Sequence, residues 1–560
     1  MKQNLLYVLV LLALLISACG DGKPTEVPAN TEAPQPTEAP VSAGGDAVLR
    51  VGWSGKPDTL NPAYAFLGES YTIFHLIYNT LTTQAIDGSY VGSLAKEWSV
   101  SEDGLTWTYH LKEGVKWHNG EPLTADQVAW AINAIMKDPE GWATLSSYTA
   151  GFTEVTAPDA TTVVIVTEYP IGNMDYRASY LYAFYRPDFE GFTTAEDLQN
   201  FANDNPMGTG PFKFRTFDKD TGVVILDANR DYVDGAPKID GIIFQTYDNA
   251  DAMVQALKVG EVDVLTSVPA SAYETVKGFE NVETTAAPNY YFYELIINSV
   301  DPNNDPAPTG NPALADPAVR LAMAHSINKQ DFVDIVFQGL AQPATTIIGP
   351  AMGGGFWHNP NIKDIPFDTA EANHVLDEAG YVLGSDGVRT KGELRLEFRL
   401  QFPTTESVYA RMADMMVGWF QQAGMKLNAE AIDEDSLVAG TTGVGDYDLI
   451  IWSWWPDPDP DFILSVLITD QFVEGGWSDS GYHNPEYDQL YLDQQQLVDK
   501  TERQKTIWKM QELVFNDRPY ITLVHWDMLQ AYRSDRFTGF IVSLRGIEGA
   551  ESLLNVEPVK

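Results

Sequence analysis

The sequence is poor in cysteine, in basic residues and in long apolar runs, and each shortage narrows the class of protein. It has 560 residues, with 35 Lys and Arg against 78 Asp and Glu, for a formal net charge of −43. Proteins that bind nucleic acid need a basic surface, so no nucleic-acid partner is expected. The only cysteine is Cys19, so no internal disulfide is possible. The eight histidines show no metal-ligand spacing, and neither a metal nor another cofactor is expected.

The N-terminus carries the only long apolar run, Leu5–Ile16, which follows Lys2. It is too short to span a bilayer and is typical of the core of a signal peptide, which predicts a signal peptide over 1–18. The stretch Leu15–Gly20 resembles a bacterial lipobox, in which the cysteine is lipidated and becomes the mature N-terminus. An ordinary signal peptide with an incidental cysteine is the alternative. The small residues just before Cys19 favour lipidation, and hence a protein held by lipid on the extracytoplasmic face of the membrane or in the periplasm.

Residues 19–45 are predicted to be a disordered linker. Thr-Glu-(Val/Ala)-Pro occurs three times, at Thr25–Pro28, Thr31–Pro34 and Thr37–Pro40. Such a segment cannot bury a core and favours extended polyproline II structure. At roughly 3.1 Å per residue it could hold the folded part about 80 Å from an anchor. A generic disordered tail would have the same physical properties.

The folded part begins near residue 46 and alternates strands with amphipathic helices, which indicates α/β lobes. Its length exceeds what one core usually organises, so two or three domains are expected. Helices are expected where capping signals precede apolar periodicity. The segments concerned are Thr124 onward, Asn249–Val259, Asp316 onward, Asp368 to Gly380 and Glu406–Ala423. Buried strands are expected at residues 47–52, 105–111, 163–166, 223–226, 242–247, 295–298 and 521–526.

The stretch Tyr447–Phe462 is the strongest candidate for a ligand site. Its apolar start, Leu449–Trp452, fits a buried strand, and the prolines that follow force the chain out of the sheet. Ligands of open α/β sheets bind beyond strand ends. Tryptophan offers a flat apolar face and one N–H for a ligand. The candidates are Trp452, Trp454, Trp455, Asp457, Asp459 and, further on, Trp477. The alternative is a rigid proline-rich loop with its tryptophans packed inside.

Signals for catalysis are weak. Ser326–Lys329 matches S-x-x-K, but the companion motifs of that acyl-enzyme chemistry are absent. Asp457, Asp459 and Asp461 alternate as at the start of an EF-hand, but Phe462 stands where that loop needs glycine. Carboxylate pairs of the glycosidase kind are unavoidable among 78 acidic residues. No enzyme activity is therefore expected.

Several motifs resemble one known family. Leu94–Asn133 closely resembles the signature of the peptide/nickel-type extracellular solute-binding proteins of ABC importers, solute-binding family 5. Later blocks repeat the match in the family's order, and together they cover nearly the whole chain from Ala47. These blocks are Gly208–Phe212, Asn229–Tyr232, Leu257–Val264, Leu314–Ala322 and Tyr482–Asp488.

The resemblance implies a periplasmic-binding-protein-like type II fold, in which a bilobal cleft is joined by an additional inserted lobe. Lobe I would be discontinuous and lobe II inserted into it. The implied boundaries are 46–91, 206–299 and 527–560 for lobe I, 92–205 for lobe II and 300–526 for lobe III. The Asp/Pro/Asn-rich segment Asp301–Pro312 would be the crossover loop and hinge.

The resemblance also implies a receptor function without chemistry on the ligand. Peptide-binding members place an aspartate after the strand that lines the cleft, where it pairs with the ligand's α-ammonium. Here Asp457 or Asp459 could do so, although the match is not residue for residue, and the tryptophans would equally suit sugar rings. Tyr64 and Phe66 are secondary candidates by family position. The expected protein is a lipid-anchored monomer that binds an oligopeptide, or alternatively an oligosaccharide, and delivers it to an ABC permease. An extracellular hydrolase and a sensory or scaffolding lipoprotein are the competing classes.

Overall fold

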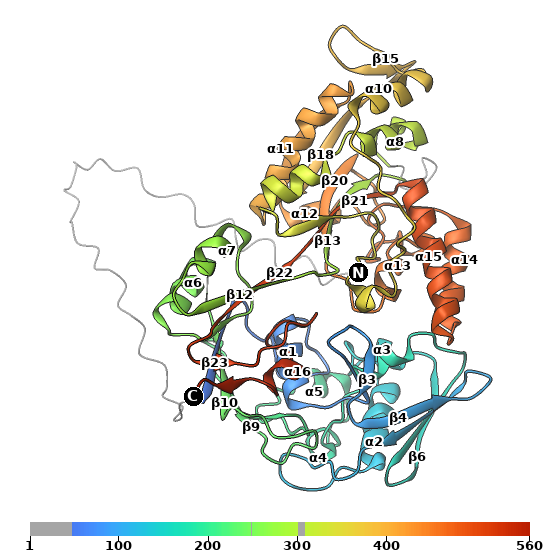
Figure 1. The fold of residues 1–560 in the computed structure, drawn as a ribbon. Coiled ribbons are helices and arrows are strands. Elements are labelled where there is room, and N and C mark those ends of the chain that lie inside the picture. The colour runs from blue at the N-terminus through green and yellow to red at the C-terminus, as the bar shows by residue number, and fades with distance from the viewer. Residues whose placement is uncertain (1–46, 248, 301–307) are drawn as a thin grey trace, which may run out of the picture. The chain divides into compact units, whose positions relative to one another are not determined.

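The computed structural model describes residues 47–247, 249–300 and 308–560. The expected signal peptide 1–18, Cys19 and the linker 19–45 lie outside the described residues, as does 301–307 of the expected crossover loop. The described chain is an α/β protein with three large sheets, each with its own apolar core (Figure 1). No helix among these residues is long and apolar enough to cross a membrane.

The seven-stranded sheet takes strands from three separate stretches of the chain. Its order is β12 (Val282–Ala287), β22 (Met528–Arg533), β11 (Val264–Leu265), β1 (Val48–Trp53), β10 (Gly241–Thr246), β9 (Val224–Ala228) and β8 (Phe212–Phe217). Central β1 runs parallel to β10 and β11, and its buried side chains join a core shared with α1 (Gly68–Ile77). The other elements of this part are β2 (Thr82–Gln84), β3 (Tyr90–Gly92), α6 (Ala250–Val259), α7 (Ala270–Lys277), β23 (Phe537–Thr538), α16 (Ala550–Leu553) and β24 (Glu557–Pro558).

The four-stranded sheet is antiparallel and comes entirely from residues 95–167. Its order is β4 (Ala95–Val100), β5 (Thr106–Leu111), β7 (Thr162–Thr167) and β6 (Phe152–Asp159). Helix α2 (Ala125–Lys137) packs on it with Val128, Ile132 and Ile135 buried. The predicted capping box is confirmed, since Gln127 Oε1 accepts a hydrogen bond from the Thr124 N–H at 3.0 Å. The short helices that follow are α3 (Met174–Ala178), α4 (Arg186–Phe189) and α5 (Ala195–Gln199).

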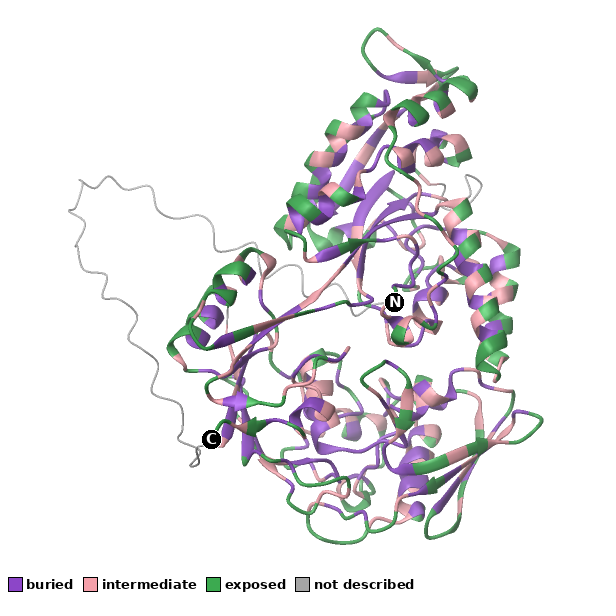
Figure 2. Cartoon of the chain, viewed as in Figure 1, coloured by how far each residue is buried: buried purple, intermediate pink, exposed green. Residues whose placement is uncertain are grey.

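The six-stranded sheet has inner strands that are buried on both faces. Its order is β14 (Ala341–Pro343), β21 (Tyr520–Trp526), β13 (Phe292–Ile297), β20 (Leu449–Trp454), β18 (Glu397–Pro403) and β19 (Lys426–Ile432). Successive residues of β20 alternate between two cores, with Leu449 and Ile451 in one and Ile450 in the other. A strand covered on both faces has no polar face, which explains the continuous apolar run in the sequence. The inner strands β13 and β21 are almost entirely buried and purple in Figure 2, whereas edge strand β19 is mostly exposed and the helices mix purple with green.

Helices surround this sheet, and predicted capping signals lie at the ends of three of them, α8 (Pro317–His325), α10 (Thr369–Glu378) and α11 (Ser407–Gln422). The others are α9 (Lys329–Asp331), α12 (Glu434–Ala439), α13 (Asp461–Ser465), α14 (Pro485–Gln496) and α15 (Lys500–Asp517). The side chains of Asp316 and Asp368 cap α8 and α10. Gly380 and Gly424, after α10 and α11, adopt positive φ, the conformation that favours glycine at helix ends. A small sheet of β15 (Val382–Leu383), β16 (Arg389–Lys391) and β17 (Leu394–Arg395) lies between α10 and β18 in the chain.

Two strand pairs carry the chain between the seven-stranded and six-stranded sheets. β12 pairs with β22 in the first sheet, and β13 pairs with β21 in the second, both antiparallel. The chain therefore changes sheets after Ala287 and returns at Asp527. The return falls at residue 527, and the outward crossover lies between β12 and β13, so that β13 belongs to the six-stranded sheet. The lobe boundaries implied by the resemblance stay a prediction.

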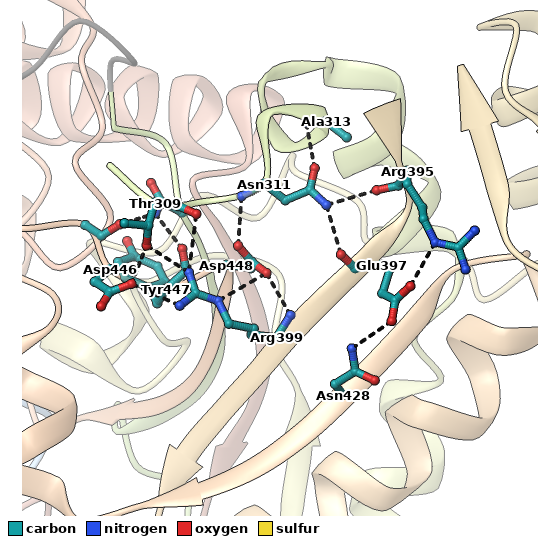
Figure 3. Close-up of polar contacts among 12 residues, drawn as sticks. Thr309, Asn311, Ala313, Arg395, Glu397, Arg399, Asn428, Asp446, Tyr447 and Asp448 are labelled. Carbon is teal, nitrogen blue, oxygen red and sulfur yellow. Dashed lines mark hydrogen bonds and ion pairs between the residues drawn. The ribbon is translucent and has the colours of Figure 1, made fainter. Parts of the chain in front are cut away.

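A polar network fixes the start of β20 (Figure 3). The carboxylate of Asp448 accepts hydrogen bonds from the backbone N–H of Asn311 at 2.8 Å and of Arg399 at 2.7 Å. The Asn311 side chain donates to the backbone carbonyls of Arg395 and Glu397, each at 2.9 Å. These bonds join the segment that begins at residue 308 to β18 and β20. They therefore hold in place the start of the strand that leads into the tryptophan-rich loop.

Candidate ligand-binding cavity

A cavity of about 930 Å³ lies at the far end of β20, beside the two crossovers. This volume is near the upper end of the range typical of small-molecule sites. Its walls come from the end of β1 and the loop after it, α1, the β2–β3 hairpin, the segments around Tyr148 and Tyr180, both crossovers, the loop after β20 and a C-terminal turn. Aromatic side chains dominate the lining: Trp53, Phe66, Tyr71, Tyr90, Tyr148, Tyr180, Tyr290, Tyr291 and Trp455. The charged or titratable residues are Glu69, His75, Asp457, Arg545 and Glu548.

The loop after β20 contributes Trp455, Pro456, Asp457 and Pro458 to the cavity. β20 ends at Trp454, and the prolines keep the next residues from pairing with a neighbouring strand. Trp455 is 67% exposed and stacks on Tyr291 of the outward crossover, with ring centroids 5.9 Å apart and planes 24° apart. An exposed tryptophan held by a second ring presents a flat apolar face to the cavity.

Asp457 is a half-buried carboxylate at this wall. Its pKa is raised to about 6, mainly by burial and in part by the charges of Asp459 and Asp461, although the hydroxyl of Tyr176 lowers it. No lysine or arginine of the described ranges forms an ion pair with it. A carboxylate in a poorly hydrated aromatic wall is therefore left to be neutralised by a proton or by a ligand cation.

Asp459 has a different environment from Asp457. Its side chain is 2% exposed, and its two oxygens accept hydrogen bonds from Nη1 and Nη2 of Arg503, each at 2.6 Å. Arg503 is 1% exposed, its Nε donates a hydrogen bond to Gln494 Oε1 at 3.0 Å, and its guanidinium lies over the ring of Trp357. The structure thus places Asp459 in a buried ion pair and not in the lining of the cavity.

Three predicted tryptophans also lie outside the cavity lining. Trp452 and Trp454 are half-buried and pack against one core of the six-stranded sheet. Trp477 is 54% exposed and meets the ring of Phe462 edge-on at 5.3 Å. Of the four predicted tryptophans, the structure brings only Trp455 to the cavity.

The loop after β1 supplies one predicted residue to the lining. Phe66 lines the cavity, whereas Tyr64 packs edge-on against Phe66 at 5.3 Å without lining it. The backbone N–H groups of Phe66 and Leu67 donate to the carboxylate of Asp58 at 2.9 and 3.3 Å, which fixes this loop.

Most of the lining was not predicted from the sequence. The tyrosines come from five separate segments, and the parallel stack of Tyr148 on Tyr180, at 4.3 Å, joins residues 32 positions apart. The pair Tyr290–Tyr291 directly before the buried strand β13 was an available signal. Arg545 and Glu548 lie in an irregular turn whose sequence has no distinctive pattern. Among the residues that the structure describes, no group of three His, Cys, Asp or Glu side chains could hold a metal ion.

The two sheets, their paired crossovers and the cavity beside them define the bilobal type II class of periplasmic solute-binding fold. Solved structures agree: CtaP from Listeria monocytogenes has a TM-score of 0.79 at 22% identity and covers 92% of this chain and 99% of its own. NikZ from Campylobacter jejuni, in complex with Ni(L-His), has a TM-score of 0.73 at 22% identity, and the match covers 92% of this chain and 100% of NikZ. AppA from Bacillus subtilis, in complex with a nonapeptide, has a TM-score of 0.69 at 22% identity, and the match covers 91% of this chain and 99% of AppA.

Residues 89–472 match the family model described as bacterial extracellular solute-binding proteins, family 5 Middle. The chain belongs to this family, which confirms the resemblance found in the sequence. Among curated proteins, it is 26% identical over 531 residues to the oligopeptide-binding protein AppA of Bacillus subtilis, covering 93% of this chain and 92% of AppA. It is 24% identical over 510 residues to the glutathione-binding protein GsiB of Salmonella typhimurium, and the match covers 90% of this chain and 93% of GsiB.

Proposed function

We propose that this chain is an oligopeptide receptor that holds the α-ammonium of its ligand against Asp457 and delivers the peptide to an ABC permease. One observation carries the proposal: Asp457 is a carboxylate without a basic partner, set in the wall of an aromatic cavity. A charge-assisted hydrogen bond in such a site is about twice as strong as a neutral one. The names of the relatives support the ligand class, since AppA is called an oligopeptide-binding protein.

The aromatic walls would hold the rest of the ligand. Trp455, Tyr291 and Phe66 offer apolar faces to peptide side chains, while the tyrosines add hydroxyls that can orient a peptide backbone. Asp459, Trp452, Trp454 and Trp477 have no part in this proposal, because the cavity lining does not include them. Tyr64 would act through Phe66, on which it packs.

Binding would be coupled to closure of two lobes about the crossovers. In the three-lobe scheme, β13 would belong to lobe III, so the hinge would comprise residues 288–291 and 527. A ligand that contacts Asp457 of one lobe and α1 of the other prefers the closed state and shifts the population toward it. The permease would then recognise the closed receptor, which acts as a monomer and carries out no chemistry on the peptide.

The N-terminal part of the proposal is a lipid anchor at Cys19, following a signal peptide and followed by the linker 19–45. Cys19→Ala is expected to release the protein from the membrane fraction. Unchanged membrane retention of that variant would contradict lipidation as the anchor.

A differential scanning fluorimetry screen of the purified protein tests the ligand class. A ligand at a hundred times its dissociation constant stabilises the native state by about 2.7 kcal/mol, which gives a visible shift in melting temperature. We expect shifts with free-amine peptides and none with neutral oligosaccharides. Because the lining is aromatic, an oligosaccharide is the second candidate ligand. It would be established if only glycans raised the melting temperature and if Trp455→Ala abolished that effect. Turnover of peptides or glycans by the purified protein would instead indicate a hydrolase.

A further inference from the structure

The charges that line the cavity are unequal. Three carboxylates, those of Glu69, Asp457 and Glu548, face one guanidinium, that of Arg545. A closed cavity that excludes water has to compensate each buried charge, by a partner or by a proton. The partners of Arg545 therefore decide how much negative charge is left for a ligand to neutralise.

Arg545 is already engaged away from the other acids of the cavity. Its Nη2 donates to Thr83 Oγ1 at 2.9 Å and to the backbone carbonyl of Gln84 at 2.7 Å. The same atom forms an ion pair with Glu551 at 3.4 Å. Glu551 does not line the cavity. The charge of Arg545 is thus matched by a carboxylate behind the wall, and Glu548 and Asp457 have no basic partner among the described residues.

Glu548 is held in place by a neutral donor. Gln530 Nε2 donates to Glu548 Oε2 at 2.6 Å and to the Thr266 carbonyl at 3.0 Å. Gln530 is 1% exposed, and its Oε1 accepts the N–H of Ile547 at 2.8 Å. The pKa of Glu548 is raised to about 7, mainly by burial and in part by the charge of Glu551, although the hydrogen bond from Gln530 lowers it. This carboxyl therefore has a fixed position and an unmet charge.

Tyr291 lines the same cavity as the two unmatched acids. The negative charges of Asp457 and Glu548 both raise the pKa of its hydroxyl, after the larger effect of burial. Asp457 follows β20 of the six-stranded sheet, whereas Gln530 on β22 of the seven-stranded sheet holds Glu548. The ring of Tyr291 stacks on Trp455. A cavity whose lining combines two unmatched carboxylates with aromatic faces is a favourable environment for cations.

We propose that this cavity selects ligands with two cationic groups, and that Glu548 is the residue that sets the preference. The inference rests on the proposed function and deepens it: the ligand is a peptide whose α-ammonium pairs with Asp457 and whose basic side chain pairs with Glu548. Glu69 adds to the negative potential of the same cavity. A peptide without a basic side chain leaves Glu548 to be neutralised by a proton.

Isothermal titration calorimetry of the purified protein tests this preference. The probes are tetra-alanine and variants with lysine at position one, two or three, each paired with the variant that has norleucine there. Lysine and norleucine have unbranched side chains of similar length and differ in the terminal charge. The wild type is expected to bind the best lysine peptide about tenfold or more tightly than its norleucine partner, as for a charge-assisted bond in a dry site. The inference would be overturned if the dissociation constants of the lysine and norleucine peptides differed by no more than about twofold in every pair.

The variant Glu548→Gln identifies the residue responsible. Its amide oxygen can still accept from Gln530, so the turn should keep its conformation. The preference for lysine, measured as the dissociation constant of the norleucine peptide divided by that of its lysine partner, is expected to fall to about threefold or less. The affinity of the norleucine peptides should stay the same. The matched control Glu430→Gln changes an exposed carboxylate on β19 and should leave the ratio as in the wild type. An undiminished ratio in folded Glu548→Gln would overturn the role of Glu548.

Failure of this inference can be told apart from failure of the proposed function. Absence of binding by all tetrapeptides in the wild type would contradict the peptide receptor itself. Binding of the peptides without a lysine preference would leave the receptor intact and remove only the selection by charge.

Discussion

Asp459 and Arg503 form a buried bidentate ion pair, with both oxygen–nitrogen distances at 2.6 Å. Asp457, which lies two residues earlier in the same proline-rich loop, lines the cavity and has no basic partner among the described residues. The alternation of prolines and aspartates thus places one carboxylate inside the fold and the other at the cavity. We infer that the first holds the loop and that the second is available to a ligand.

The first prediction concerns the structural role of Asp459. Asp459→Asn leaves the charge of Arg503 buried without its main partner, which typically costs about 3–5 kcal/mol. The urea midpoint of unfolding should fall markedly, whereas Glu274→Gln, at an exposed ion pair with Lys277, should leave it unchanged. A variant with wild-type stability that no longer binds peptide would show instead that Asp459 is a ligand group.

The second prediction is a pH dependence of affinity. Because the pKa of Asp457 is raised to about 6, its carboxyl is ionised at pH 8 and largely protonated at pH 5. A peptide ammonium pairs with the ionised form, so binding must displace the proton at low pH. Affinity for a peptide with neutral side chains should weaken by up to about tenfold per pH unit below 6. Calorimetric titration from pH 8 to pH 5 measures this change.

In Asp457→Asn the affinity for that peptide should be low and should vary little between pH 8 and pH 5. An equally steep pH dependence in this variant would assign the titration to another group. The neutral side chains of the peptide separate this effect from the titration of Glu548, whose pKa is about 7.

The third prediction concerns two acids buried beneath Trp454. Glu294 and Asp479 lie inside the six-stranded sheet's second core, and the hydroxyl of Tyr520 donates to Asp479. Burial raises the pKa of both carboxyls, the charge of Asp479 raises that of Glu294 further, and the N–H of Trp454 lowers both. Since the folded state binds these protons more tightly than the unfolded state, stability falls as pH rises from the unfolded pKa to the raised folded pKa.

Glu294→Gln replaces one of these two carboxyl groups by an amide, which does not titrate. The variant should gain stability relative to the wild type by up to about 1.4 kcal/mol per pH unit as pH rises from 5. Urea unfolding at pH 5 and pH 8 measures the difference, with Glu430→Gln as the exposed control. A stability difference that shrinks with rising pH would contradict the raised pKa of Glu294.

The fourth prediction concerns a contact between the β2–β3 hairpin and the turn at Gly353–Gly355. Gly354 has φ +64°, and a Cβ there would clash with the backbone carbonyl of Asp87 in the hairpin. Gly392 has a similar φ of +60°, but a Cβ there would meet no atom within 4 Å. Gly354→Ala and Gly392→Ala therefore impose the same local strain, and only the first disturbs the contact.

If this contact belongs to the ligand-bound arrangement, Gly354→Ala should raise the dissociation constant for peptide about tenfold or more, with a smaller effect in Gly392→Ala. Stopped-flow tryptophan fluorescence measures the dissociation rate, which should carry most of the change. Equal effects of the two substitutions would attribute the loss to backbone strain alone.

The sequence predicted the elements whose signals are local. The α2 capping box, the aspartate caps of α8 and α10 and the apolar run of β20 follow from neighbouring residues, and the structure confirms them. The crossover between β12 and β13 could not be recognised from the sequence, because the proline-rich segment after β13 carries stronger turn signals than this short connection. A turn signal marks a loop but does not say which sheet the next strand joins.

The site could be predicted only in part, for a similar reason. The proline-rich loop was identified, yet side chains only two residues apart, Asp457 and Asp459, have opposite surroundings. Their difference depends on Arg503, which is 44 residues further along the chain. Glu548 has no motif of its own, and its place in the cavity depends on the distant Gln530. Contacts between remote segments, and not the local pattern, decide which residues line the cavity.

The most direct test of the account is to titrate one peptide with a free α-amine, and its N-acetylated form, into the wild type and Asp457→Asn by calorimetry at pH 7.5. The account predicts that acetylation weakens binding to the wild type about a hundredfold, whereas the two forms bind Asp457→Asn within about threefold of each other. Acetylated and free peptides that bind the wild type equally well, or a penalty for acetylation that persists in Asp457→Asn, would contradict the role of Asp457 as the partner of the ammonium group.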